Sequence, residues 1–185
     1  PSQTVDMPPT SAEFVTEVSL RLGADVCEGG LACKFHGLLM DCKGRHPLSC
    51  MAGGDKTVEH SLVQHCVYDY CRRGRLQPKL EAPGLLGLPA LPGGLRRPAD
   101  VLVCAGQALE PELPDGSRPL RYRSVALDFA VVNALGQGHW TETLEEPGRA
   151  AEAYAARKRS HLSTQAQCHA RGIRFQPMVL EAQGG

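Results

Sequence analysis

Apolar residues recur along the chain with two different spacings, and these spacings predict helices and strands in a mixed order. A helix is predicted from about residue 58 to residue 73, where apolar residues recur in steps of four. Its expected apolar stripe consists of Val58, Leu62, Cys66 and Tyr70, with Val63 and Val67 alongside. A second helix is predicted over about 148–171, which is rich in alanine and is followed by Gly172.

Shorter runs of apolar and β-branched residues predict strands. One short strand is expected near Leu80, followed by strands in "ADVLVCA", "RYRSVALDFAVVNAL" and "IRFQPMVLEA". The second and third are expected to form a hairpin with a long connection that contains "PDGS". The helix before the last strand predicts a crossover and a parallel pair, and Pro177 indicates an edge or a bulge. The expected order is helix, three strands, helix, strand.

Composition excludes some classes of protein. The 185 residues suit one domain, and 20 basic residues balance 20 acidic ones, so no overall electric field attracts nucleic acid or a membrane. Any site for a polyanion must therefore be local. No apolar run approaches the roughly 20 residues needed to cross a bilayer, and the first residues do not resemble a signal peptide. We expect an intracellular protein with no membrane partner.

Eight cysteines are many for a chain without an export signal, and metal binding is the favoured explanation. The stretch "CKFHGLLMDCKGRHPLSC" contains Cys33-x2-His36 and His46-x3-Cys50, two ligand pairs that suit a tetrahedral zinc ion. Alternatives stay open at this point. Cys27, Cys42 and His60 compete as ligands, or all these residues lie in a loop with free thiols.

Two acids and a lysine are candidates for catalysis. Asp100 is either a turn residue before a strand or a metal ligand, and Asp128 lies on a strand face whose neighbours are apolar. If the two strands adjoin, the carboxylates would repel one another unless a cation such as Mg²⁺ lies between them. Lys158, four residues after Tyr154, is expected to face the sheet from the second helix, although such a lysine often only extends into solvent.

Five ordered segments together resemble a known family. They are "GRHPLSC…GGDKTVEH", "RRPADVLV", "ALDFAVV", "AAEAYAARKRSHL" and "GIRFQPMVLEAQG". This set is similar to the restriction-like endonuclease region at the C-terminal end of site-specific non-LTR retrotransposon polyproteins, which belongs to the PD-(D/E)XK nuclease superfamily. The resemblance runs from about Cys33 to the end of the chain. It departs from the family at Ala130, where most members have a lysine, and at His36, where a cysteine is more usual.

The resemblance implies a fold of the α/β class, more closely an α+β arrangement with a mixed sheet. Its restriction-endonuclease-like core would consist of a helix, a three-stranded meander, a second helix and a final strand. The domain organisation that we expect is an N-terminal extension or the tail of a preceding domain over 1–26, a zinc-knuckle-like segment over 27–56 and a nuclease-like domain over 57–185. The function implied is that of a DNA endonuclease that nicks a target site, acts in the nucleus and is attached to an upstream reverse transcriptase. The alternative is an inactive zinc-containing module that binds DNA or protein.

The resemblance also assigns site residues. The catalytic residues would be Asp100, Asp128 and Lys158, with Mg²⁺ or Mn²⁺ bound by the two acids. Structural Zn²⁺ would be bound by Cys33, His36, His46 and Cys50. Glu59 and His60 are further candidates for metal contacts. DNA phosphates would be bound by Arg96, Arg97, Arg157 and Arg159, whose alternative role is that of ordinary solvated charges.

Overall fold

The structure is a computed structural model that describes residues 10–86, 97–104, 123–136, 143 and 146–182. Its helices are α1 (Ser11–Leu22), α2 (Arg45–Ser49), α3 (Asp55–Arg73), α5 (Arg149–Ser160) and α6 (Thr164–His169), with the short 3-10 helix η1 (His161–Ser163). Its strands are β1 (Pro78–Leu80), β2 (Val101–Cys104), β3 (Ser124–Val132) and β4 (Ile173–Glu181). No helix in the described part of the chain is long and apolar enough to span a membrane.

The four strands form one mixed sheet in the order β1-β2-β3-β4. The pairs β1·β2 and β2·β3 are antiparallel, whereas β3 and β4 run parallel through nine paired positions from Ser124↔Ile173 to Val132↔Glu181. This confirms the predicted mixed α/β class, the strand order and the parallel crossover pair. Pro177 lies in β4, at the edge of the sheet, where its missing N–H costs least. The "PDGS" connection lies outside the described residues.

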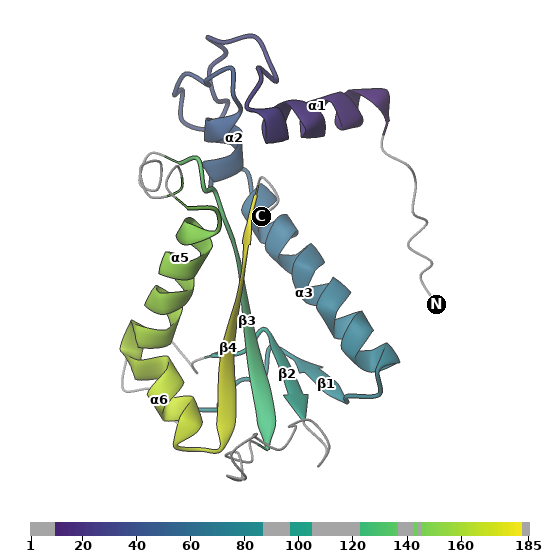
Figure 1. The fold of residues 1–185 in the computed structure, drawn as a ribbon, viewed down its shortest axis with the longest axis vertical. Coiled ribbons are helices and arrows are strands. Elements are labelled where there is room, and N and C mark those ends of the chain that lie inside the picture. Colours follow the sequence, from purple (N-terminus) through teal and green to yellow (C-terminus); the bar gives the residue numbers. More distant parts are fainter. Residues whose placement is uncertain (1–9, 87–96, 105–122, 137–142, 144–145, 183–185) are drawn as a thin grey trace.

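Helices cover both faces of the sheet, so that the molecule has three layers (Figure 1). On the α3 face, Val101, Val103 and Phe129 pack with Cys71. On the other face, Ala126 and Phe175 pack with Cys168 of α6. The two clusters use alternate residues of β3, because successive side chains of a strand point to opposite faces. Asp128, one residue from Phe129, therefore faces α5.

The predicted apolar stripe of α3 is wrong in its four main members, although Val63 and Val67, expected alongside it, do pack against the sheet. Its members Val58, Leu62, Cys66 and Tyr70 are exposed. The side of α3 that meets the sheet carries Val63, Val67 and Cys71, together with the buried Gln64. Part of the inward face of this helix is polar, because His60 and Gln64 contact a polar group of the sheet.

The predicted helix over 148–171 is also incorrect, because it is broken in the middle. Leu162 (φ 48°) and Ser163 (φ 55°) both adopt the left-handed conformation, which cannot continue a right-handed helix. The buried Thr164 donates its hydroxyl hydrogen to the carbonyl oxygen of His161 across the break, at 2.6 Å. The chain therefore turns between α5 and α6 next to the face that carries Asp128.

The cysteine- and histidine-containing segment and α2 lie at one end of the sheet (Figure 1). Asn133, directly after β3, donates from Nδ2 to the carbonyl oxygen of Arg45 (3.0 Å) and to Ser49 Oγ (2.6 Å). These bonds tie α2 to the end of the central strand. Helix α1 begins with a capping box between Thr10 and Glu13 and buries none of its residues.

Candidate active site and metal centre

Asp100 is held in place by hydrogen bonds to both its backbone and its side chain. Its backbone N–H donates to Leu127 O at 2.9 Å, and its carbonyl oxygen accepts from Gln64 Nε2 at 2.9 Å. Its carboxylate oxygen Oδ2 accepts from the backbone N–H of Phe129 at 2.6 Å and lies 3.0 Å from His60 Nε2. A residue that only caps a turn would bond its own neighbours, whereas these partners come from β3 and α3.

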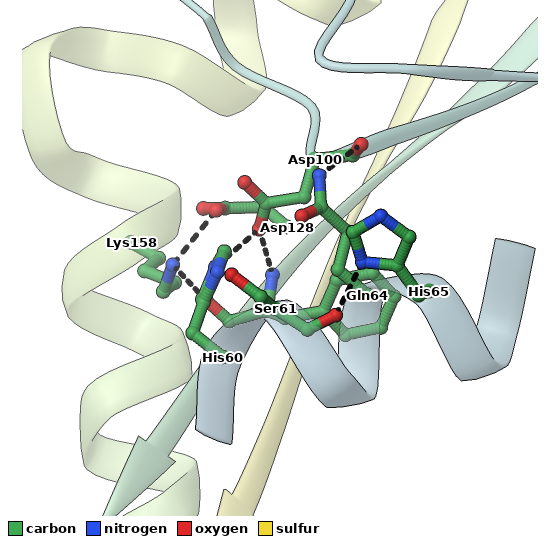
Figure 2. Close-up of polar contacts among 8 residues, drawn as sticks. His60, Ser61, Gln64, His65, Asp100, Asp128 and Lys158 are labelled. Atoms are coloured by element: carbon green, nitrogen blue, oxygen red, sulfur yellow. Dashed lines mark hydrogen bonds and ion pairs between the residues drawn. The ribbon is translucent and has the colours of Figure 1, made fainter. Parts of the chain in front are cut away.

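Asp128 of β3 forms an ion pair with Lys158 of α5, the helix that covers this face of the sheet. Lys158 Nζ lies 2.8 Å from Asp128 Oδ1 and donates to the carbonyl oxygen of Phe129 at 2.9 Å. Both side chains are largely shielded from solvent, with relative exposures of 17% for Lys158 and 21% for Asp128. The lysine therefore does not simply extend into solvent from α5. Figure 2 shows Asp100, Asp128 and Lys158 converging on one place between α3 and α5.

The electrostatics of Asp128 show that the two acids interact. Burial raises the pKa of Asp128 above its usual value, the hydrogen bond and charge of Lys158 oppose this, and the nearby charge of Asp100 raises it again. The two carboxylates are therefore close enough for the charge of one to affect the ionisation of the other. Paired carboxylate oxygens are the donors that Mg²⁺ prefers, so the residues present fit a divalent cation of this kind.

His60 and Glu59 both have polar partners within the protein. The structure places His60 on Asp100 and away from the cysteines, and Glu59 forms an ion pair with Lys56 at 2.8 Å. Sequence reasoning missed Gln64, which lies one helical turn after His60 and binds the same aspartate. The spacing of these two polar residues on one side of a helix was the available clue, but it becomes informative only when that side is known to face the sheet.

The four arginines proposed to bind DNA differ in position. Arg157 and Arg97 line a surface cavity that also contains Asp128 and Lys158, and Arg97 forms an ion pair with Glu81. Arg159 is not among the residues that line this cavity. Arg96 lies outside the described residues.

A second cluster forms at the other end of the chain. One ligand atom from each of Cys33, His36, His46 and Cys50 can be chosen so that all four lie within 4.8 Å of one another. Cys50 Sγ lies 3.5 Å from His36 Nε2. The imidazole rings of His36 and His46 contact each other edge to face, with their centroids 4.9 Å apart. These residues form a group that can hold a metal such as zinc, as the spacing predicted.

The competing cysteines have other neighbours. The Cys27 thiol donates to the carbonyl oxygen of Asp41 at 3.6 Å. Cys42 lies beside Asp25, and the hydrogen bond to that carboxylate raises the pKa of the Cys42 thiol. Neither belongs to the four-residue group, so the structure favours Cys33, His36, His46 and Cys50 over these two cysteines as ligands.

Asp41 organises the loop that carries these ligands. Its carboxylate accepts hydrogen bonds from the backbone N–H groups of Lys43 (3.0 Å), Arg45 (3.1 Å) and His46 (3.0 Å). Burial alone would raise the pKa of Asp41, but these N–H groups lower it overall. The bonds to Arg45 and His46 satisfy donors at the start of α2 and so fix the position of His46.

Two observations on the ligands themselves fit a metal ion. His46 Nε2 is buried and has no hydrogen-bond partner in the described part of the chain, an arrangement that is costly unless the nitrogen binds something else. The backbone N–H of Phe35, above all, lowers the pKa of Cys33 to about 7. A thiol that ionises this easily is available as the thiolate that zinc requires.

No protein-family model matches the chain, and no curated protein gives a significant match.

Proposed function

We propose that this chain is a metal-dependent DNA endonuclease of the restriction-like type found in site-specific retrotransposons. The observation that carries the proposal is the convergence of Asp100, Asp128 and Lys158, which come from three separate segments, on one partly buried position. Two carboxylates beside one ammonium group are the residues that hydrolysis of a phosphodiester needs. The antiparallel meander followed by a helix and a parallel strand is compatible with the core of that superfamily.

Each residue has a defined task in this proposal. Asp100 and Asp128 supply the oxygen ligands for Mg²⁺ or Mn²⁺, and His60 and the N–H of Phe129 hold Asp100 in place. When bound, the cation would polarise the scissile phosphate and acidify the attacking water. Asp128 and Phe129 O occupy two of the three donors of the Lys158 ammonium, so one donor remains for the phosphate or the water.

The reaction is a simple hydrolysis. The water oxygen forms a bond to phosphorus and gives up a proton to solvent, while the bond from phosphorus to the leaving sugar oxygen breaks and that oxygen takes up a proton from solvent to leave as a hydroxyl group. Lys158 stabilises the negative charge that develops on the phosphate oxygens. The cysteine and histidine group would hold structural zinc, and an upstream reverse transcriptase domain would use the nick in the nucleus.

A plasmid assay tests this proposal directly. Purified protein that retains its zinc is incubated with supercoiled DNA, with and without added Mg²⁺. We expect nicked circles only when Mg²⁺ is present, and a loss of nicking of at least about 100-fold in Asp128→Asn. The matched control is Asp69→Asn, which removes an exposed carboxylate of α3 and should nick like the wild type. No Mg²⁺-dependent nicking by the wild type would refute the endonuclease.

One observation favours an inactive alternative. Lys158 and His60 already pair with the two acids, so the cluster is stable as a structural network without any cation. The neutral net charge of the chain also argues against strong DNA binding by this chain alone. In that case the chain would be a zinc-containing module that binds DNA or protein. Salt-sensitive DNA binding without nicking identifies the DNA-binding form, and neither activity identifies the protein-binding form.

A further inference from the structure

A surface cavity of about 650 Å³ adjoins the acids, on the α5 side of the sheet. Its walls are formed by the segment before β2, by β3, and by α5 with its continuation into η1. Asp128 and Lys158 belong to the wall, so anything bound in the cavity lies next to the proposed scissile phosphate. The volume lies within the range of roughly 300 to 1,000 Å³ that is typical of ligand sites.

The charge of the cavity suits an anion. Besides Lys158, its wall holds Arg97, Arg157 and His161, against the single carboxylate of Asp128. Arg97 is already paired with Glu81. Arg157 and His161, by contrast, form no ion pair with a carboxylate in the described ranges, so their donors are available to a ligand.

Arg157 is held ready for a flat, bidentate contact. Its guanidinium carbon lies 4.3 Å from the centroid of the Tyr154 ring, at the distance of a cation–π contact. Tyr154 in turn packs against the buried Val132 and Ala150. A guanidinium stacked on a fixed ring loses little entropy when it binds a phosphate with two N–H groups.

The kink between α5 and α6 gives the cavity an apolar side. Leu162 lines it with 46% of its surface exposed, so it offers an apolar contact to a molecule bound there. Leu162 and Ser163 also hold a left-handed conformation, which is unfavourable for residues other than glycine. Strain of this kind in the backbone tends to occur at functional sites.

From these features we infer that the cavity is a subsite for one nucleotide of the cut strand, adjacent to the scissile phosphate. Arg157 binds the phosphate of that nucleotide, His161 supports it, and Leu162 contacts the sugar or base. This inference deepens the proposed endonuclease and rests on it. It assigns Arg157, and not the whole basic surface, as the residue that positions the strand.

The test measures binding and does not depend on cleavage. The probe is a fluorescein-labelled single strand of about 12 nucleotides, and fluorescence anisotropy is recorded without Mg²⁺ between about 50 and 200 mM salt. Arg157→Gln should weaken binding about tenfold and reduce the slope of log K against log salt by about 0.7, the value for one phosphate contact. Arg149→Gln removes an equal charge from the same helix, away from the cavity, and should change neither quantity.

Each outcome separates the subsite from the endonuclease. Equal effects of Arg157→Gln and Arg149→Gln would overturn the subsite and leave nicking to be decided by the plasmid assay. An absence of binding by the wild type would overturn it as well. A specific effect of Arg157→Gln in a protein that never nicks would show that the cavity binds a nucleotide, while the absence of nicking would refute catalysis and the placement next to a scissile phosphate. Arg157 is exposed, so equal melting temperatures for both variants should exclude misfolding as the cause.

Discussion

Lys158 Nζ lies 2.8 Å from Asp128 Oδ1, although Asp128 is on β3, Lys158 is on α5 and 29 residues lie between them in the sequence. The parallel crossover from β3 to β4 creates this contact, because it lays α5 across the face of the sheet that carries Asp128. If the chain is the proposed endonuclease, Ala130 stands where that superfamily usually has its lysine, and Lys158 supplies an ammonium group beside the same acid from α5 instead.

Removing the Lys158 charge should abolish nicking. In Lys158→Gln, the carboxylate of Asp128 loses its cation and a developing phosphate charge loses its donor. We expect nicking to fall by at least about 100-fold in the plasmid assay. Lys79→Gln removes an exposed lysine from β1 and is the control that should keep full activity. Wild-type rates in Lys158→Gln would mean that the lysine has only a structural role.

The raised pKa of Asp128 predicts a pH dependence of stability. Burial, its largest cause, favours the neutral acid in the folded state, so the folded pKa exceeds the unfolded one. The contribution of Asp128 to stability is therefore fully present below the unfolded pKa and is lost as pH rises through the folded pKa. Asparagine resembles the neutral acid at every pH. Without divalent cations, the melting temperature of Asp128→Asn should therefore gain on the wild type as pH rises above the ordinary aspartate pKa of 3.8.

A melting series over that range decides the sign of this effect. The exposed Asp69→Asn is measured in parallel and should show no such trend. If Asp128→Asn instead loses ground as pH rises, the ion pair with Lys158 outweighs burial and the pKa of Asp128 is lowered. The same shift predicts that Mg²⁺-dependent nicking declines on acidification at a higher pH than an ordinary aspartate would cause, because only the ionised carboxylate binds the cation.

The sequence predicted the strands well and one helix face poorly, for physical reasons. In β3, alternation of side chains along an extended chain assigned Asp128 and Phe129 to opposite faces, as observed. In α3, the spacing of apolar residues predicted that Leu62 and the residues four positions before and after it face the sheet, yet Leu62 is exposed. Apolar spacing alone cannot reveal that a helix presents polar residues to the sheet. His60 and Gln64 do face inward, since Asp100 supplies bonds that offset the burial of their polar groups.

The break after α5 could not be predicted either. Neither Leu162 nor Ser163 is a glycine or a proline, so the usual signs of a helix end are missing. The left-handed pair is held by its surroundings, including the bond from Thr164 to His161. The grouping of Cys33, His36, His46 and Cys50 as candidate metal ligands, by contrast, was predictable, because the ligand spacing of a short zinc site depends little on the rest of the fold.

The contact between His60 and Asp100 predicts a positioning role. In His60→Ala, Asp100 keeps the N–H of Phe129 but loses the group that fixes its Oδ2 from α3. Outer partners of this kind typically contribute about 10- to 100-fold to metal affinity or activity. We expect the Mg²⁺ concentration needed for half-maximal nicking to rise by about that factor, with a smaller change in the maximal rate.

A neighbouring histidine provides the control for this experiment. His65 lies on the same helix but is exposed and binds the carbonyl oxygen of Ser61 at 2.7 Å, as Figure 2 shows. His65→Ala should leave the Mg²⁺ requirement unchanged. An effect on maximal rate alone in His60→Ala would contradict positioning of a metal ligand and would indicate that His60 contacts the substrate.

The cysteine and histidine cluster predicts one zinc ion per chain, bound independently of Mg²⁺. Cys33→Ser removes the ligand whose pKa is about 7 and should lower zinc affinity by more than about 100-fold, measured by metal content after dialysis. Cys66→Ser removes an exposed thiol of α3 and should retain the metal. Equal zinc content in the two variants would exclude this cluster as the metal site.

Loss of zinc should also loosen the end of the sheet, because Asn133 links that end to α2. This residue binds Arg45 and Ser49 of α2, whose first turn carries the ligand His46. Without the metal, the buried His46 Nε2 has no partner in the described part of the chain and α2 should loosen. Hydrogen exchange should then accelerate in α2 and at the end of β3 near Val132, while α6 stays protected. Unchanged protection of α2 after zinc removal would show that hydrogen bonds alone, including those of Asp41, hold this segment.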